Sequence, residues 1–173
     1  KAGKAKIEVK YGEVKMEFEV DVIPTSAKLE YIGGAGITYD SVEKRLSGVR
    51  AYTTVAQALA LFDGEVAIFD RTGKNITSIN TEAYVGTGYK IATVVDGEIA
   101  DYAEIVVKGD VNGNGRIDAN DYVLIKRAYL NTVSILDEST AFAAADVNKN
   151  GFIDANDYLQ IKNHFRGLID LFN

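Results

Sequence analysis

The stretch Asp110-Val111-Asn112-Gly113-Asn114-Gly115-Arg116-Ile117-Asp118-Ala119-Asn120-Asp121 decides how the chain is organised. It places oxygen-bearing side chains at positions 1, 3, 5, 9 and 12 of a twelve-residue loop, and it has glycine at position 6. Calcium takes about six to eight hard oxygen ligands, and a short loop supplies them only when it folds around the ion. The pattern therefore predicts a calcium-binding loop, in preference to a polar turn that binds nothing.

Each position of this first loop has an expected role. Gly115 permits the sharp turn, and Ile117 is expected to point away from the ion into a core. The expected ligands are the side chains of Asp110, Asn112, Asn114 and Asp121, the backbone carbonyl of Arg116 and, through a water molecule, Asp118.

The loop is repeated 36 residues later, from Asp146 to Asp157. The match continues beyond the loop, because Ile125 corresponds to Ile161 and Lys126 to Lys162. Internal repeats of this kind argue strongly against an accidental turn. The sequence thus predicts two bound Ca²⁺, with a second ligand set equivalent to the first: Asp146, Asn148, Asn150, Phe152 through its carbonyl, Asp154 and Asp157.

Composition limits the remaining possibilities. The chain has 173 residues, 47% of them hydrophobic, which is enough for one domain or two small ones with a core. A net charge of −6 argues against a nucleic-acid partner, and six aspartates of the two loops match that figure in size. No apolar run reaches the length of a membrane helix, so no membrane partner is expected. The absence of Cys suits an extracellular module stabilised by metal, and suits a cytosolic protein equally well.

The first 23 residues are predicted to form a β-hairpin. Apolar and charged residues alternate from Lys6 to Tyr11 and from Val14 to Val22, around a turn at Gly12. Two strands alone are marginally stable, so the hairpin is expected to pack on something. It resembles the last two strands of a bacterial immunoglobulin-like repeat, either as part of the following module or as the end of a preceding domain.

A β-rich module with one short helix is predicted for residues 24–108, after a boundary at Pro24. The helix is expected from Thr54, as its N-cap, to Phe62, with Gly64 just beyond its end. Asp70 to Lys74 is expected to be a hairpin turn. The expected strands are residues 27–32, 37–39, 46–49, 66–69, 75–79, 84–85, 89–95 and 103–107.

The C-terminal part is predicted to alternate loops with helices. A strand from Ile105 leads directly into the first loop, where an ordinary EF-hand has a helix. Helices are expected at residues 122–130, 139–145 and 158–165, with Ser139 capping the second. The apolar tail after Gly167 is expected to pack back onto the protein.

These features make residues 109 to about 167 resemble a dockerin, the calcium-dependent module that binds a cohesin domain. The resemblance rests on the duplicated Asp-x-Asn-x-Asn-Gly-x-Ile-Asp-Ala-Asn-Asp-Tyr loops, on Asp at position 12 and on Ile-Lys in each following helix. Residues 24–108 loosely resemble an X-type spacer module that often precedes dockerins. The expected fold class is therefore α+β and multi-module: a hairpin at 1–23, a β-rich spacer at 24–108 and an all-α dockerin at 109–173.

The resemblance also implies which residues contact cohesin. Loop positions 10 and 11 and basic residues of the following helix fill this role in dockerins. The near-duplication implies that either repeat can face the partner, while Arg127 opposite Asn163 breaks the symmetry. Solvated helix surface is the competing interpretation of the lysines. The implied contacts are Ala119, Asn120, Lys126 and Arg127 in the first repeat, and Ala155, Asn156, Lys162 and Asn163 in the second.

Other functions are weighed against this one. An enzyme is not expected, because the chain has no Cys and its one histidine, His164, lies at a helix end; no small-molecule substrate is expected either. The parent protein is expected to be a secreted or cell-surface bacterial protein, for example a glycoside hydrolase. The alternatives are a calcium-stabilised stalk without a cohesin partner and a carbohydrate-binding platform built from Tyr31, Tyr39, Tyr52, Tyr84 and Tyr89.

Overall fold

The computed structural model describes residues 3–22, 27–135 and 139–173. The boundary expected at Pro24 lies outside the described residues. Below, the β-rich unit denotes residues 27–108, and the C-terminal unit denotes residues 109–173.

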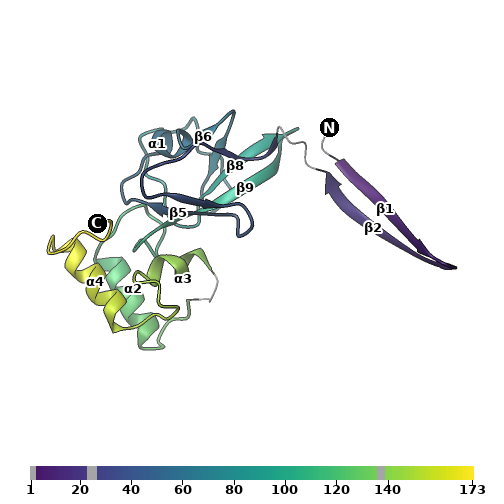
Figure 1. Ribbon diagram of the computed structural model, residues 1–173. Helices are drawn as coiled ribbons and strands as arrows, with labels where there is room; N and C mark the ends of the chain where they lie inside the picture. The colour runs from purple at the N-terminus through teal and green to yellow at the C-terminus, as the bar shows by residue number, and fades with distance from the viewer. Residues whose placement is uncertain (1–2, 23–26, 136–138) are drawn as a thin grey trace.

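The N-terminal hairpin forms as expected, from β1 (Gly3–Tyr11) and β2 (Val14–Val22). The strands pair antiparallel, with Ile7 opposite Phe18. Large apolar side chains of both strands remain exposed, for example Ile7 at 48% and Phe18 at 46%, and the hairpin extends away from the remainder of the protein (Figure 1). The expectation that it packs on a neighbouring element is therefore wrong for the described part of the chain.

The β-rich unit is built on a sheet with the strand order β4-β5-β9-β8-β7. Only β5 and β9 pair in parallel, and the other neighbours are antiparallel. A second, two-stranded sheet pairs β3 with β6. The strands are β3 (Glu30–Tyr31), β4 (Thr38–Asp40), β5 (Arg45–Val49), β6 (Phe62–Asp63), β7 (Ala67–Phe69), β8 (Lys90–Val95) and β9 (Glu98–Val107).

Several expected elements are shorter than predicted or absent. Residues 75–79 are not a strand, because the Asn75 side chain accepts hydrogen bonds from the backbone and hydroxyl of Thr77 and forms a local turn. Residues 84–85 contribute one isolated bridge, from Tyr84 to Thr54. The strand expected over residues 27–32 is reduced to β3.

Helix α1 (Val55–Leu59) begins where the sequence indicates. Thr54 is its N-cap, and Gln57 completes a capping box. The helix ends earlier than expected because Phe62 leaves it to pair with Tyr31 in the small sheet. Phe62 is then buried against Tyr31 and Tyr39, with ring centroids 5.5 and 5.6 Å away.

Strand β9 connects the two hydrophobic cores of the molecule. Ala103, Ile105 and Val107 face the core of the β-rich unit, whereas Val106 faces the core of the C-terminal unit. This is the period-two alternation of a strand covered on both faces. The C-terminal unit is therefore packed against the sheet and not connected to it by an extended linker (Figure 1).

The C-terminal unit contains α2 (Ala119–Tyr129), α3 (Thr140–Ala145) and α4 (Ala155–Phe165). Helices α2 and α4 each begin three residues before the expected start, because Asp118 and Asp154 are their N-caps and form capping boxes. The two helices pack together through Tyr122 and Tyr158, whose ring centroids are 6.0 Å apart. None of the helices in the described ranges has the length and apolar character needed to cross a membrane.

Candidate metal and partner-binding site

The first loop is closed by the carboxylate of its last residue, Asp121. Its Oδ1 accepts hydrogen bonds from the amides of Val111 (2.9 Å) and Asn112 (3.1 Å), and its Oδ2 accepts one from Asp118 (3.0 Å). The side chain at position 12 therefore holds both ends of the loop. This arrangement follows from the first turn of α2, which places Asp121 one turn after its N-cap.

Asp110, at position 1, organises the middle of the same loop. Its Oδ1 accepts from Gly113 (2.8 Å) and Asn114 (3.0 Å), and its Oδ2 accepts from Gly115 (2.9 Å). Gly115 has φ +76°, a left-handed conformation that favours glycine, as the sequence predicts. Ile117 is buried in the core of the C-terminal unit, also as expected.

The second loop repeats this geometry. Asp157 Oδ1 accepts from the amide of Val147 (3.0 Å), and its Oδ2 accepts from Asp154 (2.8 Å). Asp146 Oδ2 accepts from Gly151 (2.8 Å). A short helix, α3, leads into this loop, whereas a strand leads into the first. In both loops the carboxylates at positions 1 and 12 thus accept hydrogen bonds from amides of their own loop, and position 12 is bonded to the amide of position 9.

Burial disfavours the charged form of several loop aspartates. Asp110, Asp121 and Asp157 are fully buried. Burial raises the pKa of Asp121 to about 6, and it also raises the pKa values of Asp110 and Asp157, against the opposing effect of backbone hydrogen bonds. A cation would compensate buried carboxylates of this kind.

The donor atoms suit a hard cation. Carboxylate, amide and carbonyl oxygens are the ligands that calcium prefers. In the described ranges no three His, Cys, Asp or Glu side chains gather as a metal cluster by themselves. The expected ligand set instead combines aspartates with Asn112, Asn114 and a backbone carbonyl, or with their counterparts in the second loop.

The two loops differ in their surroundings, and the sequence analysis missed this. The first loop contacts the β-rich unit through Tyr52, Arg71 and Thr87, which donate hydrogen bonds to it. The second loop is exposed from Asn148 to Phe152. A signal was present in the sequence: position 4 is Gly113 in the first copy and Lys149 in the second.

The expected partner contacts lie at the surface to different degrees. All four first-repeat residues are exposed, but in the second repeat only Asn156 is, and the other three are half-buried. The chain after α4 folds back there, and the amide of Leu168 donates to the carbonyl of Asn163 (2.8 Å). His164 is part of the same region, since its Nδ1 accepts from the amide of Leu171 (3.3 Å).

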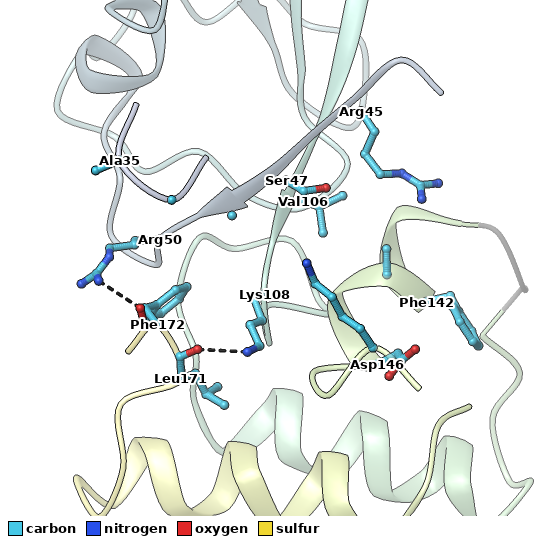
Figure 2. Close-up of a pocket in the computed structure, with 14 residues that line it drawn as sticks. Ala35, Arg45, Ser47, Arg50, Val106, Lys108, Phe142, Asp146, Leu171 and Phe172 are labelled. Atoms are coloured by element: carbon cyan, nitrogen blue, oxygen red, sulfur yellow. Dashed lines mark hydrogen bonds between the residues drawn. The ribbon is translucent and has the colours of Figure 1, made fainter. Parts of the chain in front are cut away.

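A pocket of about 470 Å³ lies between the two units, and Figure 2 shows the side chains that line it. Lys108 Nζ donates to the carbonyl of Leu171 (3.0 Å), and Arg50 Nη2 donates to that of Phe172 (3.2 Å). Burial lowers the pKa of Lys108, and the positive charge of Lys149 adds to this effect. Two cations of this pocket thus attach the C-terminal tail to the β-rich unit, as the apolar tail sequence predicts.

The five tyrosines considered for carbohydrate binding do not form one flat surface. Tyr31 and Tyr39 pack against the core of the β-rich unit. Tyr84 is covered by Tyr52, edge to face at 5.3 Å, and by the guanidinium of Arg116 at 5.6 Å from its ring centroid. Tyr89 is half-buried against the core. The packing of Tyr31, Tyr39 and Tyr89 agrees with their strand spacing, which favours core positions over the alternative of a stacking platform.

Comparison with known families agrees with this geometry. Residues 108–166 match the model of the dockerin type I domain. No curated protein matches the chain. The match begins just before the first loop and ends just after α4, so it covers both loops and both long helices. Residues 108–166 are thus similar to the dockerin type I domain, and a β-rich region precedes them.

Proposed function

We propose that this chain docks its parent protein onto a cohesin domain. This binding requires two Ca²⁺ in the loops of the C-terminal unit. Dockerin domains are non-catalytic, calcium-dependent docking modules that typically bind cohesin. The observation that carries the proposal is the duplicated loop, in which Asp121 and Asp157 are fully buried and join both ends of their loops. Each loop then presents the start of a long helix to solvent.

The Ca²⁺ ligands are proposed to be the residues expected from the repeat. The ions would neutralise carboxylates that the fold buries, and they would fix the N-termini of α2 and α4. The loop residues next to the ligands, Ala119 and Asn120, are exposed at the start of α2. Calcium thus orders the loop, and the partner contacts protein residues beside the ion, not the ion itself.

The proposed organisation is a β-hairpin at 1–23, a β-rich spacer at 24–108 and a dockerin at 109–173. The spacer shares strand β9 between both cores, which supports a role in holding the dockerin in a defined orientation. Dockerin modules occur in extracellular cellulosome proteins, so we place the parent protein outside the cell, at a bacterial surface or scaffold.

Titration of the chain against a panel of cohesins, with calcium and with excess chelator, tests the docking function. Calcium-dependent binding to at least one cohesin class is the expected result. Calorimetry that shows calcium binding without binding to any cohesin in the panel would favour the calcium-stabilised stalk. An unchanged cohesin affinity in chelator would contradict the calcium requirement.

The exposure of the two repeats favours one orientation of the partner. Lys126 and Arg127 of α2 are exposed, whereas Lys162 and Asn163 of α4 are half-buried beside the returning tail. An exposed cation on a helix reaches a partner without displacing other parts of the chain. We therefore assign the main cohesin contacts to the first repeat.

Lys126→Ala and Lys162→Ala form a matched pair, because both change the same residue at equivalent positions. Lys126→Ala is expected to weaken cohesin binding about tenfold, a loss typical of an interface contact. Lys162→Ala should have a clearly smaller effect. Equal losses would show that both orientations are used, and a larger loss for Lys162→Ala would reverse the assignment.

A further inference from the structure

The first loop is held from outside by three residues of the β-rich unit. The amide of Thr87 donates to Oδ2 of Asp110 (3.0 Å), which is the expected first calcium ligand. Arg71 Nη1 donates to the carbonyl of Asn112 (2.6 Å), and the amide of Tyr52 donates to the carbonyl of Gly115 (2.8 Å). Two of the three contacts therefore fix the backbone of the loop, and one fixes the orientation of a ligand.

The loop also fits against this surface without space for side chains. A Cβ at Gly113 would lie 2.6 Å from the carbonyl oxygen of Thr87 and 2.7 Å from Nη1 of Arg71. A Cβ at Gly115 would lie 2.6 Å from the carbonyl oxygen of Val85. From the other side, a Cβ at Gly86 would collide with the carbonyl oxygen of Gly113. The segment from Val85 to Thr87 and the first loop are thus in direct backbone contact.

The second loop has no equivalent support in the part of the chain that the structure describes. A Cβ at Gly151 would meet nothing within 4 Å, and position 4 carries Lys149 with φ +59°. The residue at position 7, Phe152, is 72% exposed, whereas its counterpart Arg116 lies over Tyr84. The differences between the two otherwise similar loops therefore occur at positions that touch the β-rich unit in the first copy.

We propose that the β-rich unit is part of the first calcium site, with Arg71, Gly86 and Thr87 as positioning residues that make the first loop bind calcium more tightly than the second. This inference rests on the proposed calcium function and concerns residues outside the dockerin match. The physical reason is preorganisation: a loop that is already held in place loses less conformational freedom when it binds the ion. Partners that orient metal ligands typically contribute about 10- to 100-fold to affinity.

The effect of removing Arg71 on calcium affinity distinguishes an electrostatic role from a positioning role, because the two roles predict changes in opposite directions. Removing a cation near a calcium site strengthens calcium binding if only electrostatics acts. Removing a hydrogen bond that holds the loop weakens it. Arg71→Ala is expected to weaken calcium binding at the first loop about tenfold. Lys74→Ala removes the same charge from the same exposed turn, and it should leave this affinity unchanged or slightly higher.

The full chain is titrated with Ca²⁺, in a chelator buffer if binding is tight, and the amide resonances of Gly115 and Gly151 are followed by NMR. Each amide reports on its own loop, because each donates to the first aspartate of that loop. In the unmodified chain Gly115 should respond at lower free calcium than Gly151. Arg71→Ala should shift only the Gly115 midpoint.

Gly86→Ala is the second variant, because it separates the loop from the β-rich unit without changing any loop residue. Retained amide signals from β8 and β9 show that the unit is folded, and the Gly115 midpoint should again rise. Equal midpoints for both loops, with no shift in Arg71→Ala or Gly86→Ala, would overturn the inference and leave the docking function standing. An absence of calcium response at both glycines would overturn the calcium function itself.

Discussion

At the scale of single residues, Asp121 shows how one side chain serves both the fold and the proposed metal site. It is the third residue of α2, it completes the capping box with Asp118, and it joins the ends of the loop. Asn114 differs from it in being exposed, with its side-chain oxygen accepting from the amide of Arg116 (2.8 Å). The two expected ligands are therefore unequal in their structural role.

Asp121→Ala is expected to weaken calcium binding at the first loop on the order of a hundredfold, because it removes a carboxylate and three amide partners together. Asn114→Ala removes a neutral, exposed ligand and should cost about tenfold or less. Isothermal titration calorimetry of each variant measures the difference. Equal calcium affinities in the two variants would refute it.

Asp101 is the buried carboxylate of the β-rich unit. It accepts hydrogen bonds from Lys44 Nζ (2.6 Å) and from the amides of Leu29 (2.9 Å) and Tyr102 (3.0 Å). Burial alone would raise the pKa of Asp101, but these donors outweigh it and lower the pKa below its ordinary value. The interaction therefore connects the chain at Leu29 and Lys44 to β9.

The sign of the pH dependence follows from this lowered pKa. A carboxyl whose folded-state pKa is depressed stabilises the protein above its unfolded pKa of about 4, and this contribution is lost as pH falls through the folded value. We expect the melting temperature of the β-rich unit to decrease when the pH is lowered below about 4. Asp101→Asn should lower the melting temperature at pH 7 and flatten this acid dependence. A variant with the same acid dependence as the unmodified chain would contradict the assignment.

At the scale of elements, the C-terminal tail joins the two units. Leu171 is 5% exposed within the core of the C-terminal unit, and its carbonyl accepts from Lys108. Phe172 lies beneath Arg50, with the guanidinium 5.3 Å from the ring centroid (Figure 2). Leu168 and Ile169 remain exposed, so only the end of the tail is packed.

Deletion of residues 168–173 is expected to lower the melting temperature of the C-terminal unit. Leu171→Ala should reproduce much of the effect, because creating a cavity at a buried leucine costs about 2–4 kcal/mol. Ile169→Ser serves as the control on the exposed part of the tail and should have little effect. Thermal denaturation followed by circular dichroism measures all three, and an unchanged melting temperature after the deletion would count against tail packing.

At the scale of the whole molecule, the buried carboxylates link folding of the C-terminal unit to metal. Without a cation, the fold buries the carboxyls of Asp110, Asp121 and Asp157, and burial opposes their ionisation. A ligand that binds only the folded state stabilises it. The β-rich unit has its own core, formed by residues such as Leu46, Ile68 and Ile91, and does not depend on these carboxylates in the same way.

Excess chelator is therefore expected to unfold residues 109–167 and to abolish partner binding, while most of the β-rich sheet persists. Far-UV circular dichroism should lose the signal of α2 and α4. Amide signals from β8 should be retained. Helical signal and cohesin binding that are both unchanged in excess EDTA would contradict this coupling.

The amino-acid sequence is sufficient to predict the two loops and the helices after them. Local chemistry is sufficient for this, because the aspartates at positions 1, 9 and 12 bond to amides of the same loop, and Asp118 and Asp154 start their own helices. The same holds for α1, whose capping box lies within four residues. Both copies of the loop lie within the residues that match the family model.

The surroundings of each loop, in contrast, depend on contacts between residues that are far apart in the sequence. Short strands such as β3 and β6 form because Tyr31 and Phe62 meet across the fold, and no local pattern indicates that pairing. The hydrogen bond from Arg71 to Asn112 spans 41 positions of the sequence, and the one from Thr87 to Asp110 spans 23. Sequence spacing cannot place such pairs, because their approach depends on how the sheet and β9 orient the C-terminal unit. The fold therefore places two nearly identical loops in different environments. In the sequence this difference is visible at Gly113, which contacts the β-rich unit and corresponds to Lys149 in the second loop.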